Sequence, residues 1–68
     1  MSSFFEAQQV RLKLKMTLSN YAWYRNSAVI ADADGFIVLV GVKRIDNSIR
    51  KVIPQIVDGV SIKTEIDN

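Results

Sequence analysis

Two apolar runs joined by an acidic turn constrain this chain more than any other feature. AVIADADG (residues 28–35) is followed directly by FIVLVGV (residues 36–42). Asp-Gly flanked by β-branched and other apolar residues is the strongest short-range signal for a β-hairpin. The sequence therefore predicts two antiparallel strands at the centre of the fold, at about 26–33 and 36–44.

Composition limits both the size of the fold and its chemistry. The 68 residues suffice for one small domain of marginal stability, and eight Val and eight Ile favour a sheet. The sequence contains no Cys and no His. This excludes disulfides, thiol nucleophiles, imidazole bases and ordinary zinc sites.

The C-terminal third of the chain reads first as a helix and then as a strand. The apolar residues at helical spacing are Ile49, Val52, Ile53, Ile56, Val57 and Val60. Asp46, Asn47 and Ser48 are N-cap candidates, and Asp58-Gly59 is expected to stop the helix. Pro54 interrupts the pattern and indicates a bent or short helix. We therefore expect a helix at about 48–58 and a strand at about 60–66.

The segment VRLKLKMTL (residues 10–18) fits two kinds of secondary structure. Its apolar residues alternate strictly with polar ones, which is typical of a half-buried strand. A helix also gives a coherent buried face, formed by Ala7, Val10, Leu14, Leu18 and Tyr21. Ser3 and Glu6 have the spacing of a capping box, which favours a helix at about 4–19.

Several of these residues resemble the signature of BON domains, a family of small phospholipid- or partner-binding modules. The resemblance at the hairpin is carried by Asp34-Gly35, Ile37, Leu39 and Gly41. Elsewhere it is carried by Val10, Leu14 and Leu18 and by Arg50, Ile53, Val57 and Gly59-Val60. The chain departs from the family pattern at Lys43, Pro54 and Ile62, and the stretch between Gly41 and Gly59 is short.

The resemblance implies an α+β fold in the order α-β-β-α-β, with a three-stranded sheet covered by two helices on one face. It also implies a helix for residues 10–18 and a binding function without catalysis.

The residues themselves provide no signature of an active site or a metal site. Asp32 and Asp34 invite a calcium interpretation, but an EF-type loop counted from them has Ile30 and Gly41 where ligands are needed. No Ser–Lys or paired-carboxylate arrangement is recognisable. We therefore expect no enzyme activity, no catalytic residue, no metal site and no cofactor.

The most informative candidate surface is the side of the first helix opposite its buried face. Phe5, Leu12 and Met16 lie there, with Arg11 and Lys15 on one flank and Lys13 on the other. Residues 1–25 carry four bases against one acid, whereas residues 26–68 carry five bases against six acids. A helix that is apolar on two faces has to bury the second face against something.

The segment NYAWYRN (residues 20–26) places Tyr21, Trp23 and Tyr24 beside Arg25. Aromatic rings next to a base are typical of single-stranded nucleic-acid sites and of lipid headgroup boundaries. The alternative is a helix-to-strand corner whose rings close the end of a small core. We expect at least one of Trp23 and Tyr24 to be exposed.

The continuous run in residues 36–42 also suggests that either Ile37 and Leu39, or Phe36, Val38 and Val40, face outward.

These features favour a binding module that docks on an anionic membrane surface, on another protein or on a second copy of itself. The alternatives are a nucleic-acid-binding protein that uses the basic, aromatic N-terminal region and an obligate homo-oligomeric structural protein.

MSSFFEAQQ (residues 1–9) lacks the features of a secretory signal. A complete chain is therefore expected in the cytoplasm, and a domain excised from a longer protein outside it.

Overall fold

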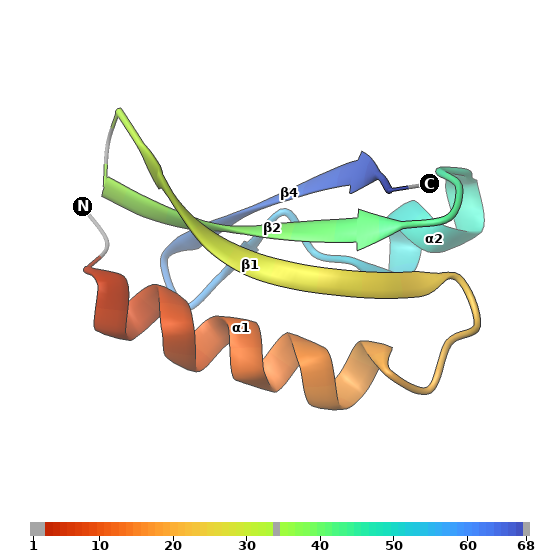
Figure 1. The fold of residues 1–68 in the computed structure, drawn as a ribbon, viewed down its shortest axis with the longest axis horizontal. Helices are drawn as coiled ribbons and strands as arrows, with labels where there is room; N and C mark the ends of the chain where they lie inside the picture. The colour runs from red at the N-terminus through yellow and green to blue at the C-terminus, as the bar shows by residue number, and fades with distance from the viewer. Residues whose placement is uncertain (1–2, 34, 68) are drawn as a thin grey trace.

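A computed structural model describes residues 3–33 and 35–67, which form an α+β fold with two helices (Figure 1). The elements follow one another as α1 (Phe4–Leu18), β1 (Tyr24–Asp32), β2 (Gly35–Val42), α2 (Asn47–Val52), β3 (Ile56–Val57) and β4 (Val60–Ile66). The expected α+β class with two helices is confirmed. The sheet contains a fourth strand, the short β3, which the sequence did not predict.

The sheet is mixed, with strand order β1-β2-β4-β3. β1 and β2 form an antiparallel hairpin in which Val29 pairs with Val38 and Asp32 with Gly35. β4 lies parallel to β2 and pairs Ile62 with Val38. Gly35 has a φ of 123°, a backbone conformation that favours glycine. Asp34, the other residue of the predicted Asp-Gly turn, lies outside the described residues.

Helix α1 settles the ambiguity of residues 10–18 in favour of a helix. The Ser3 hydroxyl accepts a hydrogen bond from the Glu6 N–H, and the Glu6 carboxylate accepts one from the Ser3 N–H, each at 3.1 Å. This is the predicted capping box. The helix buries Ala7, Val10, Leu14 and Leu18. Tyr21 was expected on this buried face, but it follows the end of α1 and is 39% exposed.

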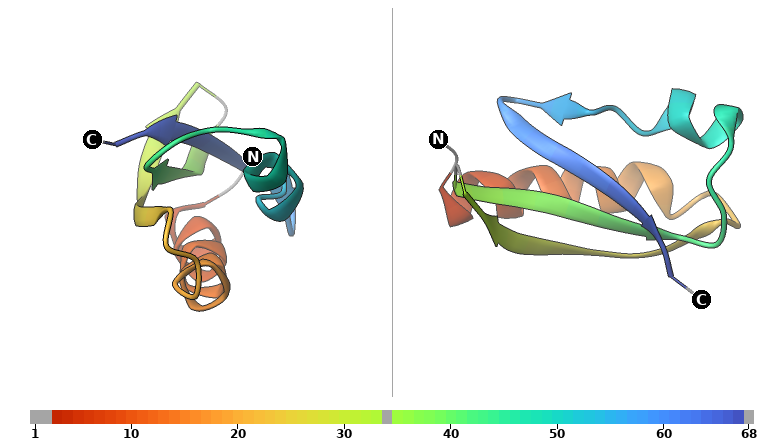
Figure 2. Two further views of the ribbon diagram at one scale, coloured as in Figure 1. Left: turned by 90° about the vertical axis from the view of Figure 1, so that its right-hand side faces the viewer. Right: turned by 90° about the horizontal axis from the view of Figure 1, so that it is seen from above.

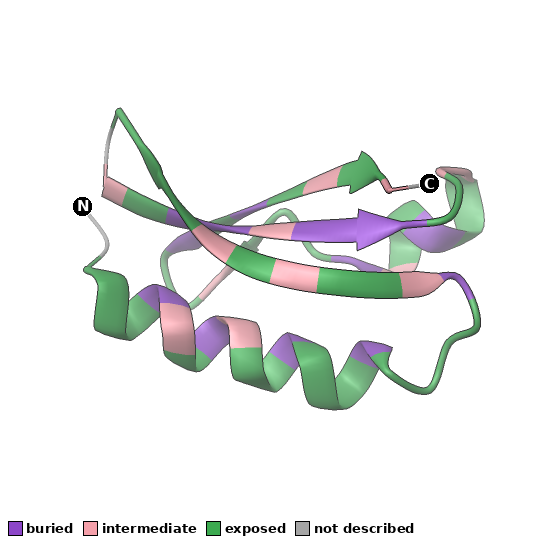
Figure 3. Ribbon diagram, viewed as in Figure 1, coloured by how far each residue is buried: buried purple, intermediate pink, exposed green. Residues whose placement is uncertain are grey.

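The hydrophobic core lies on one face of the sheet (Figures 2 and 3). Val38, Val40 and Val42 of β2 point to this face and are fully buried. They pack with the buried face of α1 and with Ile49 and Ile53 from the α2 region. α1 runs beneath the strands, and α2 lies at the end where β2 finishes (Figure 2). Residues of both helices therefore contribute to a single core.

Helix α2 is shorter than the helix predicted for residues 48–58. It begins after Asp46, whose side chain caps it, and ends at Val52. Ile53 is already extended, with φ −91° and ψ 112°. Pro54 explains this end, because proline disfavours helical geometry in the residue before it and cannot donate a helical hydrogen bond. The apolar residues beyond Pro54 belong to strands.

The Asp58-Gly59 pair has a different role from the predicted helix stop. Asp58 has a φ of 50° and Gly59 a φ of 81°. The two residues form the turn of a tight hairpin in which Val57 of β3 pairs with Val60 of β4. Two consecutive residues with positive φ are the signature of a type I′ turn, which suits the twist of a two-residue hairpin.

Gly41 lies beneath a hydrogen bond on the face of the sheet opposite the core. Asn26 pairs with Gly41 in the β1–β2 ladder, and its side-chain amide donates to the Asp67 carboxylate. A Cβ at Gly41 would overlap the Asn26 side chain and approach the Asp67 Cβ to 3.1 Å. The absence of a side chain at residue 41 therefore makes room for this contact.

We expect Gly41→Ala to lower the free energy of unfolding by about 1 kcal/mol, because Asn26 has to move. In an Asn26→Ala background the same change is expected to cost less than half as much. Urea unfolding of the four proteins gives this double-mutant cycle. An equal cost in both backgrounds would contradict the proposed conflict between residue 41 and Asn26.

The cap of α2 predicts a local dependence on pH. Asp46 accepts hydrogen bonds from the Ser48 hydroxyl at 2.6 Å, the Ile49 N–H at 3.0 Å and the Arg44 Nε at 3.1 Å. These bonds lower the pKa of Asp46 to about 2, from its ordinary 3.8, and the bond from Ser48 has the largest effect. Because the folded pKa is the lower one, the contribution of Asp46 to stability is complete above the ordinary value and is lost as pH falls toward 2.

A carboxyl ¹³C NMR titration should therefore place the midpoint of Asp46 near 2, and the amide protection factors in α2 should fall over the same range. Asp46→Asn serves as the control, because asparagine keeps a capping oxygen but does not titrate. A midpoint close to 3.8 would contradict the cap geometry.

Candidate docking surface

The outer face of α1 exposes three large apolar side chains. Phe5 is 70% exposed, Leu12 40% and Met16 77%. Leu14, which lies between Leu12 and Met16 in the sequence, is only 6% exposed. Helical spacing at about 100° per residue places all three side chains opposite the buried face. Figure 3 shows this side of α1 exposed along the length of the helix. We call Phe5, Leu12 and Met16 the α1 ridge.

Three basic side chains lie between the α1 ridge and the buried face of the helix. On one side, Arg11 donates from Nε to the Gln8 side chain at 3.1 Å, and Lys15 is exposed one turn further on. On the other side, the Lys13 ammonium lies 2.9 Å from the Asp58 carboxylate, and both side chains are about two-thirds exposed. An exposed pair of this kind contributes little to stability. It does link α1 to the β3–β4 turn.

A shallow hollow borders the N-terminal end of the ridge. It has a volume of about 180 Å³ and is lined by Phe5, Glu6, Gln9, Val10 and Asp58. The ridge is therefore a raised apolar strip with a depression beside Phe5. It lies on a single helix whose opposite face is fixed in the core.

Trp23 is part of the core and does not lie on this surface. It is 8% exposed and packs with the buried side chains of α1 and β2. Its backbone carbonyl accepts a hydrogen bond from the Lys43 N–H at 2.9 Å. At least one of Trp23 and Tyr24 was expected to be exposed. This prediction is wrong, because Trp23 is buried and Tyr24 is half-buried. Trp23 therefore offers no ring to a lipid or a base.

The other aromatic residues of the corner are engaged within the protein. The Tyr21 ring stacks on Trp23 with 4.8 Å between ring centroids and 25° between planes. The Tyr24 hydroxyl donates to the Ser27 hydroxyl at 3.0 Å. Arg25 lies in the irregular pairing between Tyr24 and Asn26 and is exposed. The corner closes the end of the core and leaves Arg25 as its exposed cation.

Neither of the helices in residues 3–33 and 35–67 lies on the second face of the sheet (Figure 2). Because Val29 and Val38 point to the core, the neighbouring pairs Ile30–Ile37 and Ala28–Leu39 point the other way. Of the two sets considered for β2, Ile37 and Leu39 are therefore the outward ones. Ile37 is nevertheless only 6% exposed, whereas Ile30 is 36% exposed.

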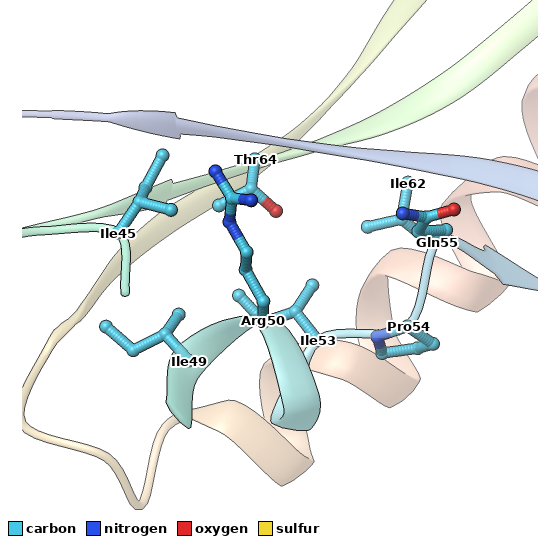
Figure 4. Close-up of a pocket in the computed structure, with 8 residues that line it drawn as sticks. All are labelled: Ile45, Ile49, Arg50, Ile53, Pro54, Gln55, Ile62 and Thr64. Carbon is cyan, nitrogen blue, oxygen red and sulfur yellow. The ribbon is translucent and has the colours of Figure 1, made fainter. Parts of the chain in front are cut away.

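The structure also contains a pocket that the sequence did not indicate. It has a volume of about 240 Å³ and lies between α2 and β4, where Arg50 and Thr64 face an apolar lining (Figure 4). The sequence pattern did not reveal the pocket, because the apolar residues before and after Pro54 share one helical spacing although α2 ends at Val52. The segment that follows α2 leaves it to pair with the start of β4, so that the pocket is bounded by residues from separate elements.

Within the described residues, no group of acidic side chains is placed to hold a metal ion. No helix in the same part of the chain is long and apolar enough to cross a bilayer.

Comparison with known proteins gives no match to a family model, a curated protein or a solved structure. The resemblance to BON domains therefore stays an expectation.

Proposed function

We propose that this protein is a non-catalytic docking module that lays the outer face of α1 on an anionic membrane surface. The observation that carries the proposal is the exposure of the α1 ridge on a helix whose opposite face is buried. Large apolar side chains at Phe5, Leu12 and Met16 would enter the boundary between headgroups and acyl chains, as in helices that lie in the membrane interface.

Charge favours an anionic lipid surface over a second copy bound through the same helix. Arg11, Lys13 and Lys15 flank the ridge, and Glu6 is the single acidic residue within α1. Two copies packed ridge to ridge would bring basic flanks of like sign together. Anionic headgroups instead attract each Lys or Arg near the surface by about 1 kcal/mol.

Sedimentation with vesicles tests the proposal, using neutral phosphatidylcholine vesicles and vesicles that also contain phosphatidylserine, at low and high salt. We expect binding to the anionic vesicles that weakens with salt. Replacing Phe5, Leu12 and Met16 by Gln should abolish it. Replacing Arg11 and Lys15 by Gln should weaken it roughly thirtyfold at low salt, from about 2 kcal/mol of lost attraction.

Ile30→Gln with Ile56→Gln is the matched control. Both residues are exposed and apolar, and both lie on strands away from the ridge. This variant should bind as the unmodified protein does. Equal binding of the ridge variant and the control, or failure of the unmodified protein to bind either vesicle, would contradict the proposal.

Self-association through the sheet is a second candidate function, favoured by a different observation. β1 forms one edge of the sheet, and residues 26–31 of this strand carry neither a charge nor a proline. Natural edge strands usually carry such features to prevent pairing. Sedimentation equilibrium should then show a dimer that Ala28→Lys dissociates, because Ala28 lies on this strand and is exposed. A monomer at all concentrations would exclude this candidate.

A further inference from the structure

The pocket between α2 and β4 combines an apolar lining with a cation and a strand edge that have no partner among the described residues. Its lining includes Ile45, Ile49, Ile53 and Ile62. A volume of about 240 Å³ is below the range of about 300–1,000 Å³ typical of sites for drug-sized ligands. A cavity of about 150 Å³ can hold a benzene ring. The pocket therefore suits a single apolar side chain.

Arg50 supplies a charge at this pocket. Its side chain extends from α2 toward β4 (Figure 4). The ion pairs found among residues 3–33 and 35–67 involve Lys13 and Arg44, and the Arg50 guanidinium has no partner there. An unpaired guanidinium beside an apolar hollow fits a carboxylate, which it can bind through two parallel hydrogen bonds.

Thr64 adds backbone groups that face the same region. The Ile62 N–H donates to the Gln55 carbonyl at 2.9 Å, so the backbone of Ile62 points away from β2. Backbone groups alternate along a strand, and those of Thr64 therefore point to the same edge. β3 pairs with Ser61 and Val60 only, and no described residue continues the pairing as far as Thr64.

We infer that this pocket binds the C-terminal end of an extended peptide whose last residue is apolar. The last side chain enters the isoleucine-lined hollow, and the terminal carboxylate pairs with Arg50. The peptide backbone adds to the free edge of β4 at Thr64, a recurrent mode of peptide recognition. A free fatty acid would use the hollow and Arg50 but leave the strand edge unpaired. The peptide uses all three features.

Amide and side-chain NMR on the whole protein tests the inference. The probes are four tetrapeptides with acetylated N-termini and free C-termini, of sequence Ser-Thr-Ala followed by Val, Leu, Ile or Phe. We expect at least one to shift the Thr64 amide and the Arg50 Nε–H resonances together. The same peptide with an amidated C-terminus should bind at least tenfold more weakly, as should the free peptide with Arg50→Gln.

Lys51→Gln is the control for charge, because Lys51 is the next residue of α2, is exposed, and does not line the pocket. It should leave the affinity unchanged. N-methylation of the peptide amide that pairs with Thr64 should abolish binding. Octanoate is the competing probe. If octanoate shifts the pocket resonances and no peptide does, the pocket is a site for small amphiphiles and the inference is wrong. It is equally wrong if all four peptides leave Thr64 unmoved.

Discussion

Leu14→Glu should unfold the protein at room temperature, whereas Met16→Glu on the same helix should leave it folded. Leu14 is 6% exposed and packs in the core, and Met16 is 77% exposed. A carboxylate at residue 14 loses the burial of a leucine and desolvates a charge, which together cost several kcal/mol. A chain of this size has a total stability of only about 3–10 kcal/mol.

Glutamate is a suitable probe because its helix propensity is close to that of leucine and methionine. The loss of stability in each variant therefore reports whether the original side chain is buried or exposed. Circular dichroism and thermal unfolding give the measurement, and Leu14→Met serves as the conservative control. If residues 10–18 formed a strand, Leu14 and Met16 would share a face and respond alike. Equal destabilisation by the two glutamates would thus contradict the helix and the ridge derived from it.

The second large effect is expected for Trp23→Ala, which should lower the free energy of unfolding by about 3–5 kcal/mol. Trp23 is 8% exposed, and its removal also leaves Tyr21 without the ring on which it stacks. Urea unfolding gives the measurement, with Trp23→Phe retaining part of the volume as a control. A loss below about 1 kcal/mol would place Trp23 outside the core.

Burial of Trp23 has a consequence for its fluorescence. The free protein should already show the blue-shifted emission of a buried indole. Anionic vesicles should leave this emission nearly unchanged, because the proposed contact is made by the α1 ridge. A large shift on addition of vesicles would contradict the separation between this ring and the docking surface.

Local signals in the sequence were sufficient for α1 and for the β1–β2 hairpin. The capping box at Ser3 and Glu6 favoured a helix where hydrophobic periodicity left helix and strand open, and the two strands were recognised from composition and turn chemistry. The phase of α1 also predicted that Leu12 and Met16 would be exposed. Each of these features is encoded within a few neighbouring residues.

Features that depend on distant contacts were not predictable in the same way. Ile56 and Val57 continue the helical spacing of α2, but Pro54 prevents the helix from reaching them. Asp58-Gly59 suits a helix end and a hairpin turn equally well, and pairing with β4 decided between them. The burial of Trp23 agrees with the alternative of a corner that closes the core, but which ring is buried depends on distant elements. The pocket at Arg50 is also formed by elements far apart in the chain, and no local pattern predicted it.

The contact between the α1 ridge and lipid can be measured directly with a single nitroxide label. The sequence has no cysteine, so Met16→Cys and Ser61→Cys each give a unique labelling site, on the ridge and at an exposed residue of β4 respectively. With anionic vesicles, we expect the label at residue 16 to become accessible to oxygen and shielded from a water-soluble relaxant. The label at residue 61 should stay in water. A label at residue 16 that remains in water while the protein is bound to vesicles would contradict docking through α1.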